Sequence, residues 1–310
     1  MLYSGGDWLL ALQYSILFVA TQFVNKYVLS VLKFTYPTIF QGWQTLVGAV
    51  ILRVLALTGK IDLVTSDISR SSIAPHIPSM MTYVVTIYSG SKALSSLPIP
   101  TFLAISNASA ILPTIFQLAT RKNLSQISCV KSVLFVLLTT MICWSDPYYT
   151  YTSNGYFWMF IFIISSGIKE ILGALTTKLR EIDKLYCNYV YSVIMLAPSS
   201  YFLGDALAAR AFPFLYFYRF YVGCVLSGVF GVFLQMSAIQ LAEKKLSHLS
   251  FNQFIGACKI LTTTISFAFF DMTFTSSHIA WISISLILEV IPNGLVENTN
   301  EENEQSETSP

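Results

Sequence analysis

Charged side chains are scarce in this sequence. Asp, Glu, Lys and Arg make up 11% of the 310 residues, against about a quarter in an average soluble domain, and 54% of the residues are apolar. The formal net charge is only +2, and no basic stripe with interleaved aromatic residues occurs, so the electrostatic footprint of nucleic-acid binding is missing. Low charge and recurrent apolar stretches near the length of a bilayer crossing indicate an integral membrane protein.

Cysteine and histidine are too few and too scattered to suggest a site. The five cysteines lie inside or at the edges of apolar segments, with neither CxxC nor paired spacing, so the sequence predicts no disulfide framework and no metal site. The histidines His76, His248 and His278 show no HxxxH or HExxH spacing, and we expect them to be solvated. We expect no cofactor.

Acidic groups do not converge either. Asp146, Glu170, Asp271 and Glu289 stand singly in different apolar segments or at their edges. A membrane-bound transferase would need acid, base or metal groups that meet in one place. An enzyme is therefore the weaker hypothesis, and we expect none.

Ten apolar segments follow one another, separated by charged, Pro-rich or Gly-rich breaks, at about 8–31, 38–58, 74–94, 98–120, 129–146, 155–174, 185–204, 213–241, 249–271 and 275–292. The first has no basic n-region and no small-residue cleavage site, which favours a retained span over a signal peptide. The sequence therefore predicts an all-α integral membrane protein with ten transmembrane helices. The acidic, polar end at 296–310 predicts a disordered tail.

The distribution of positive charge predicts the orientation. With ten spans, both termini lie on one side of the membrane. If that side is the cytosol, ten basic residues lie in cytosolic loops: Lys60, Arg70, Arg121, Lys122, Lys131, Lys178, Arg180, Lys184, Lys244 and Lys245. The opposite loops hold Lys33 and Arg210, with Lys92 and Arg219 near segment ends. This excess predicts cytosolic termini, and it places Asn123, in the sequon "NLS", in a cytosolic loop.

A faint internal repeat divides the chain. "LSSLPIPTFLAISN" (94–107) aligns with "LSHLSFNQFIGACK" (246–259) at four identical positions, with an offset of 152 residues. These stretches open the fourth and ninth segments, which correspond in two halves of five spans. An odd number of spans per half inverts one half relative to the other, as in many secondary transporters. We therefore expect inverted repeats at 1–150 and 151–295.

The ninth segment carries a polar stripe around one lysine. Asn252, Gly256, Lys259, Thr263 and Ser266 recur at spacings of 4, 3, 4 and 3, so they share one helical face. A charge at the bilayer centre costs about 2.5–3.5 kcal/mol on insertion scales, so it usually faces a cavity or a partner. Either Lys259 contacts an anionic solute in a central cavity, or it snorkels or pairs with Glu170 or Glu289.

Two other segments offer polar candidates. Asn25 and Lys26 in the first segment either line a cavity or, for Lys26, anchor the helix end at the interface. In the seventh segment, Asn188 and Ser192 share a helical face, whereas Tyr186 and Tyr189 fit an interfacial aromatic belt. From this stretch alone we favour the belt over a binding site.

Five stretches together resemble the nucleotide-sugar transporter branch of the drug/metabolite transporter superfamily. They are "NKYVLS", "YPTIFQGWQT", "SKALSSLPIPTFLAIS", "YCNYVYSVIMLAP" and "IGACKILTT", and the resemblance extends to about residue 292. It implies ten helices in two inverted halves that exchange a cytosolic nucleotide sugar for a lumenal nucleoside monophosphate across the Golgi or endoplasmic reticulum membrane. We expect a UDP-sugar, with UDP-N-acetylglucosamine first. The sequence leaves monomer and homodimer open.

The resemblance also implies roles for single residues. Tyr186 and Asn188 would lie near the nucleobase, Gly256 and Lys259 near the phosphates and sugar, and Asn25 at the same site; Thr263 and Ser192 join them on their helical faces. Relatives often carry a basic residue near the position of Asn107, which this chain lacks. A transport-inactive scaffold and an exporter of another anionic metabolite therefore remain as alternatives.

Overall fold

The computed structural model describes residues 5–63, 73–120, 125–176, 179–244, 251–270 and 274–292, and this part of the chain is helical without strands. The expected tail at 296–310 and Asn123 lie outside these residues. The helices are α1 (Gly5–Lys26), η1 (Tyr27–Val31), α2 (Pro37–Leu57), η2 (Ala74–His76), α4 (Ile77–Ser96), α5 (Ile99–Ser106), η3 (Asn107–Ala110), α6 (Ile111–Ala119), α7 (Gln126–Ser145), α8 (Tyr149–Leu175), α9 (Glu181–Phe202), α10 (Asp205–Ala208), η4 (Ala209–Ala211), α11 (Tyr218–Glu243), α12 (Phe251–Phe269) and α13 (Ser276–Val290).

Each of the ten apolar segments lies on one of these helices or helix runs, with ends that differ by a few residues. Six runs of the described residues are long and apolar enough to cross a membrane, or seven if the pair formed by α9 and α10–η4, bent by 74°, counts as one span. The protein is therefore a helical, multi-pass membrane protein. Ten crossings in two inverted halves stay a prediction.

Proline residues explain two of the breaks in the helices. Pro98, with φ −58° and ψ 150°, separates α4 from α5 because the preceding residue, Leu97, is held in an extended conformation. Pro113 lacks an amide hydrogen and its ring crowds the carbonyl four residues earlier, so the helix tightens into the 3₁₀ turn η3 just before it. This turn carries Asn107.

The end of α1 is irregular for a different reason. After Lys26 the helix widens into the π-helix η1, in which the Leu32 amide donates to the Tyr27 carbonyl over 2.9 Å. Short π segments within helices occur frequently at functional sites. Here the π segment follows directly on a buried lysine.

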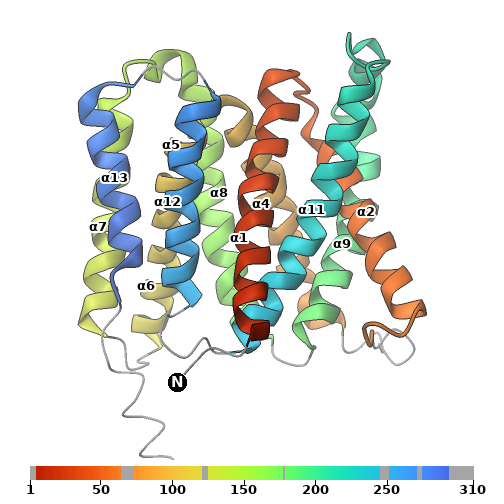
Figure 1. Ribbon diagram of the computed structural model, residues 1–310, viewed down its shortest axis with the longest axis horizontal. Coiled ribbons are helices and arrows are strands. Elements are labelled where there is room, and N and C mark those ends of the chain that lie inside the picture. Colours follow the sequence, from red (N-terminus) through yellow and green to blue (C-terminus); the bar gives the residue numbers. More distant parts are fainter. Residues whose placement is uncertain are drawn as a thin grey trace, which may run out of the picture.

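The helices pack in corresponding pairs. Helix α1 packs against α11, and α8 packs against α4; α2 packs against α9, and α7 against α13. In Figure 1, α7 and α13 stand together at one edge of the bundle and α2 and α9 at the other. The N-terminal end of α1 and the C-terminal end of α13 lie at the same end of the bundle (Figure 1).

The histidines are not all solvated, contrary to expectation. His278 is only 1% exposed, and its ring nitrogens lie 3.2 Å from the Thr101 hydroxyl and 3.1 Å from the Ser145 hydroxyl. His76 is also buried. His278 joins α5, α7 and α13, a contact between segments far apart in sequence that spacing alone could not show. His248 lies outside the described residues.

Candidate functional site

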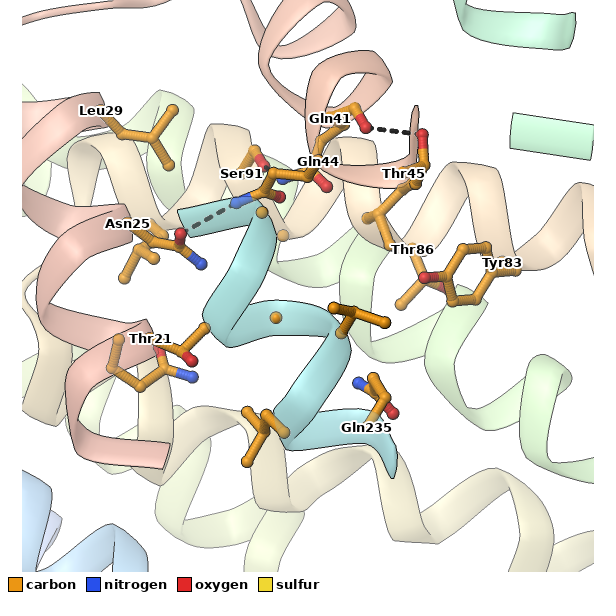
Figure 2. A pocket seen from close by; sticks show the side chains of 18 of the residues that line it. Thr21, Asn25, Leu29, Gln41, Gln44, Thr45, Tyr83, Thr86, Ser91 and Gln235 are labelled. Carbon is orange, nitrogen blue, oxygen red and sulfur yellow. Dashed lines mark hydrogen bonds between the residues drawn. The ribbon is translucent and has the colours of Figure 1, made fainter. Parts of the chain in front are cut away.

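A polar cavity of about 280 Å³ lies inside the bundle, between α1, α2, α4 and α11, with single residues from η1, α5, α8 and α9. We call it the central cavity. Its polar lining consists of carboxamides, hydroxyls and two phenols, and carries no charged side chain: Thr21, Gln22, Asn25, Gln41, Gln44, Thr45, Tyr83, Thr86, Ser91, Tyr189 and Gln235. Figure 2 labels most of these polar side chains, which come from separate helices and surround a common space. A neutral lining with many donors and acceptors suits a neutral polar group of a ligand.

Hydrogen bonds hold part of this lining in place. The Gln44 amide donates to the Asn25 side-chain oxygen over 2.9 Å (Figure 2), and both residues also bond to the Ser227 hydroxyl. The Gln41 amide donates to the Ser91 hydroxyl. These contacts join α1, α2, α4 and α11 around the cavity.

One hydroxyl in the lining has no partner. The Thr21 side chain is 6% exposed, and its Oγ1 makes no hydrogen bond in the described part of the chain. An unsatisfied buried polar group costs about 1–3 kcal/mol, so a ligand atom or water that met this hydroxyl would be favoured. The Thr21 hydroxyl is therefore available to a ligand atom or water in the central cavity.

A second cavity of about 240 Å³, which we call the vestibule, shares Tyr83 and Gln235 with the central cavity. It lies where α4 and α9 begin and where α8 and α11 end. It differs from the central cavity because it carries charged side chains. Its lining comprises His76, Ser79, Met80, Tyr83, Lys169, Gly173, Glu181, Lys184, Leu185, Asn188, Gln235 and Ile239.

Two ion pairs lie at the N-terminal end of α9, beside the vestibule. Lys184 Nζ lies 2.7 Å from Glu181, and Arg180 Nε lies 2.9 Å from the buried Asp183. The hydrogen bond to Asp183 and the charge of that carboxylate raise the pKa of the Arg180 guanidinium above its ordinary value. Arg180 also donates to the Asp62 carbonyl over 2.6 Å, which ties α9 to the chain after α2.

Lys26 lies beside the end of the central cavity opposite the vestibule, next to the lining residue Asn25. Its ammonium is buried, and it donates to the Leu94 carbonyl over 2.9 Å and to the Leu97 carbonyl over 2.7 Å. Carbonyls at a helix C-terminus lack intrahelical partners and carry partial negative charge, so they suit a cation. This Lys26 clamp joins the end of α1 to the end of α4. Lys26 is therefore an internal contact and not an interfacial anchor.

The vestibule and the clamp lie at opposite ends of α4. Ser79 lines the vestibule and Leu94 accepts from the clamp, so about 22 Å of helix separates them at 1.5 Å per residue. Phe34, Phe212 and Phe220 pack together beyond the clamp, with ring centroids 4.8–5.1 Å apart. The cavity system thus approaches the Lys26 clamp at one end and adjoins the vestibule at the other.

Lys259 lies in a different place from the two cavities. Its ammonium is 2.6 Å from the Asn107 side-chain oxygen and 2.7 Å from a Glu289 carboxylate oxygen, and both charged side chains are largely buried. Of the two interpretations of this lysine, the structure shows the pairing with Glu289. The role of Lys259 as a phosphate contact stays a prediction that this arrangement does not display.

The other residues of the ninth-segment stripe surround this ion pair or lie deeper in the helix. Gly256 faces Glu289 so closely that an added Cβ would lie 3.2 Å from its side chain. Thr263 is buried, and its hydroxyl has no hydrogen-bond partner among the described residues. The stripe is thus polar on one face as predicted, but that face meets α13 and η3 instead of the central cavity.

The remaining predicted residues are divided between the two cavities and the packed interior. Asn25 lines the central cavity, and Asn188 lines the vestibule. Ser192 is fully buried and donates to the Asn188 carbonyl over 2.7 Å within its own helix. Tyr186 packs in a small apolar cluster, whereas Tyr189 reaches the central cavity.

Sequence reasoning missed several residues of the two cavities. Gln41, Gln44 and Thr45 lie at helical spacings of 3 and 4 in an otherwise apolar segment, which is the signal that identified the stripe around Lys259. Lys169 in the vestibule was also missed. It is next to Glu170 in the sequence, and two adjacent opposite charges give no indication that either one faces a cavity. In the described ranges, no three His, Cys, Asp or Glu side chains gather at one place.

Comparison with known proteins gives close and more distant relatives, although no family model matches the chain. The UDP-N-acetylglucosamine transporter TMEM241 homolog of Xenopus laevis is 38% identical over 263 residues, which cover 83% of this chain and 86% of that protein. The UDP-N-acetylglucosamine transporter TMEM241 of Mus musculus is 38% identical over 273 residues, or 87% of this chain and 91% of that protein. A GDP-mannose transporter of Aspergillus niger is 24% identical over 289 residues, or 86% of this chain and 74% of that protein.

Proposed function

The chain belongs to the nucleotide-sugar transporter family. We propose that it carries UDP-N-acetylglucosamine across the Golgi membrane in exchange for UMP. The observation that carries the proposal is the central cavity, a neutral polar space inside an apolar bundle, in a chain 38% identical to two transporters named for that substrate. The central cavity and the vestibule together fall within the range of about 300–1,000 Å³ that is usual for small-molecule sites.

The mechanism is alternating access. One end of the cavity system is closed by the Lys26 clamp, and the other continues into the vestibule, which is the asymmetry expected of one state of such a carrier. Substrate enters at the vestibule, and the clamp opens when the cavity is exposed to the other side. If the termini are cytosolic, as the loop charges predict, the vestibule faces the cytosol, because α1 and α4 run in the same direction and the vestibule lies where α4 begins.

Two inverted halves, 1–150 and 151–295, give this mechanism its symmetry. The pairing of α1 with α11 is matched by the pairing of α8 with α4, as an exchange of halves requires. Asn107 and Lys259, which the offset of 152 residues makes equivalent, lie 2.6 Å apart. Equivalent positions touch only near a two-fold axis, so this contact supports an axis that passes between η3 and α12.

The exchange is nearly electroneutral. A UDP-sugar carries two negative charges, and UMP carries nearly two near neutral pH because its second phosphate pKa is about 6. The carboxamides of the central cavity bind neutral hydroxyl, amide or base edges of the substrate, with Asn25 among them. Asn188 contacts the substrate from the vestibule.

The test is uptake into liposomes that contain the purified protein and are preloaded with UMP. Labelled UDP-N-acetylglucosamine, UDP-galactose and GDP-mannose are offered in parallel, and liposomes without UMP are the control. We expect UMP-dependent uptake of the first compound above the others. Uptake of none by folded protein would favour a transport-inactive scaffold, and UMP-independent passage of other anionic metabolites would favour an exporter.

A further inference from the structure

We propose that Lys169 forms an anion site in the vestibule and is the residue that meets the phosphates of the transported nucleotide. The inference rests on the proposed function and deepens it, since it names a phosphate contact that neither family resemblance nor sequence spacing assigned. It arises from the cavity lining, in which Lys169 stands on α8 beside the entrance to the neutral central cavity.

Three other lysines within the bundle already hold partners. Lys26 donates to two backbone carbonyls, and Lys131 donates to the Ile291 carbonyl over 2.6 Å. Lys259 is held by Glu289 and Asn107. For each of these ammonium groups, an incoming phosphate would first have to displace an existing contact.

Lys169 differs from them. Across the described residues, its ammonium has neither a hydrogen-bond acceptor nor an ion-pair partner, and the charge that acts on it is that of Glu170, the next residue. Adjacent residues point about 100° apart on a helix, and Glu170 is exposed at the surface outside both cavities. Lys169 thus points toward the vestibule while its neighbour does not line it.

The same face of α8 runs from one cavity to the other. Phe162, which lines the central cavity, precedes Lys169 by seven residues, or two turns, and Gly173 follows by one further turn. Phe162 and Lys169 therefore lie about 10 Å apart along the helix. No atom lies within 4 Å of a Cβ added at Gly173, so there is open space beside the lysine.

The charges around Lys169 leave the vestibule positive. The Glu181 carboxylate is paired with Lys184, and the Asp183 carboxylate with Arg180. Among the charged side chains that line the vestibule, two lysines and one glutamate leave a net charge of +1. An anion placed there meets an uncompensated ammonium group in a partly desolvated site, where such a contact is strengthened.

A nucleotide matches this division of polar groups. Its base and sugar are neutral and rich in donors and acceptors, as are the carboxamides of the central cavity. Its phosphates carry all of its charge, and the central cavity has no charged side chain to meet them. With the base or sugar in the central cavity, the phosphates extend toward Tyr83 and Gln235, which both cavities share, and reach Lys169.

The experiment measures binding by purified full-length protein of three probes: UMP, uridine and inorganic pyrophosphate. Thermal stabilisation gives the Kd for wild type, Lys169→Met, Lys169→Arg and the control Lys92→Met, which changes a partly buried lysine outside both cavities. We expect Lys169→Met to weaken UMP and pyrophosphate about ten- to hundred-fold, the scale of one charge-assisted hydrogen bond. Uridine should bind with unchanged Kd, and Lys169→Arg and Lys92→Met should bind all three as wild type does.

The outcomes separate the two proposals. If wild type binds UMP and Lys169→Met binds it equally well, the lysine site is wrong and the transporter proposal stands. If pyrophosphate stabilises wild type but not Lys169→Met, while no nucleotide binds, the anion site stands and the proposed substrate is wrong. Equal losses for uridine and UMP would show that the lysine acts on folding and not on phosphate, and an absence of binding by all probes would overturn both proposals.

Discussion

Replacement of Lys26 by methionine should open the end of the cavity that the clamp closes. The ammonium group holds the last turns of α1 and α4 together through the Leu94 and Leu97 carbonyls. Methionine keeps much of the side-chain length and apolar volume but can donate to neither carbonyl. Under the proposed alternating-access mechanism, opening that end separates the two helices and breaks the contact, so its loss should shift the equilibrium toward the opened state.

The size of the shift follows from the contact. A hydrogen bond to a charged group contributes about 1.5–3 kcal/mol net, and we count the ammonium once because both carbonyls share one charge. At 1.4 kcal/mol per decade, the population of the opened state should rise about ten- to hundred-fold. Global stability should change less, because removing a buried ammonium also relieves about 2.5–3.5 kcal/mol of insertion cost.

Native cysteines report the shift without added labels. Cys224 is buried on α11, one turn beyond the Phe34–Phe220 contact at the clamped end, whereas Cys187 lies on α9 at the vestibule end. Maleimide labelling followed by peptide mass spectrometry gives each rate. We expect Cys224 to react about ten- to hundred-fold faster in Lys26→Met and Cys187 to react no faster.

The matched control is Lys92→Met, which removes a partly buried lysine near the same end of α4 without breaking the clamp. It should leave both labelling rates unchanged. Folded Lys26→Met protein with the wild-type Cys224 rate would refute the clamp as the closing element. Equal acceleration at Cys224 and Cys187 would mean general loosening and would refute it too.

Three further predictions concern the cavity, the ion pair and the orientation. Gly231→Leu should keep its melting temperature yet abolish exchange, because a Cβ there meets no atom within 4 Å and the side chain fills the central cavity; Gly228→Ala, whose Cβ would lie 2.9 Å from Val47, should instead lower stability. Lys259→Met should lower the melting temperature by leaving the buried Glu289 carboxylate unpaired, and adding Glu289→Gln should restore most of the loss; an additive double mutant would contradict the pairing. Asn123 should carry no glycan in cells, whereas a glycan there would place its loop in the lumen and reverse the orientation.

The helices were predictable because a membrane imposes them. A chain in lipid must satisfy its backbone hydrogen bonds within each segment, so apolar runs of sufficient length become helices whatever their partners. Proline marked several of the breaks, as at Pro98 between α4 and α5. The π segment after Lys26 was not predictable, since it depends on the tertiary contacts of a buried lysine with another helix.

The site was predictable only in part, because helical spacing gives the face of a residue but not what that face meets. The stripe around Lys259 is polar for a reason, yet its partner Glu289 lies thirty residues later, and no spacing rule chooses between Glu170 and Glu289. Asn25 lines the central cavity, which was one of the two positions that the sequence left open for the polar end of the first segment. Gln41 and Gln44 of α2 show the same helical spacing, but their side chains are neutral. The cost of burying a charge, which singled out Lys259, therefore does not apply to them.

The arrangement of lysines explains why charge alone is a poor guide to a substrate site in such a bundle. A buried ammonium that no ligand contacts must be compensated while it stays buried, and Lys26, Lys131 and Lys259 each have an internal partner. A lysine that serves an exchanged anion needs the opposite condition: no protein acceptor or carboxylate may hold its ammonium where the anion passes. Lys169 meets that condition among the described residues that line the vestibule. Lys259 was conspicuous in the sequence because it lies deep in an apolar segment. The same depth explains why its ammonium is paired with the Glu289 carboxylate.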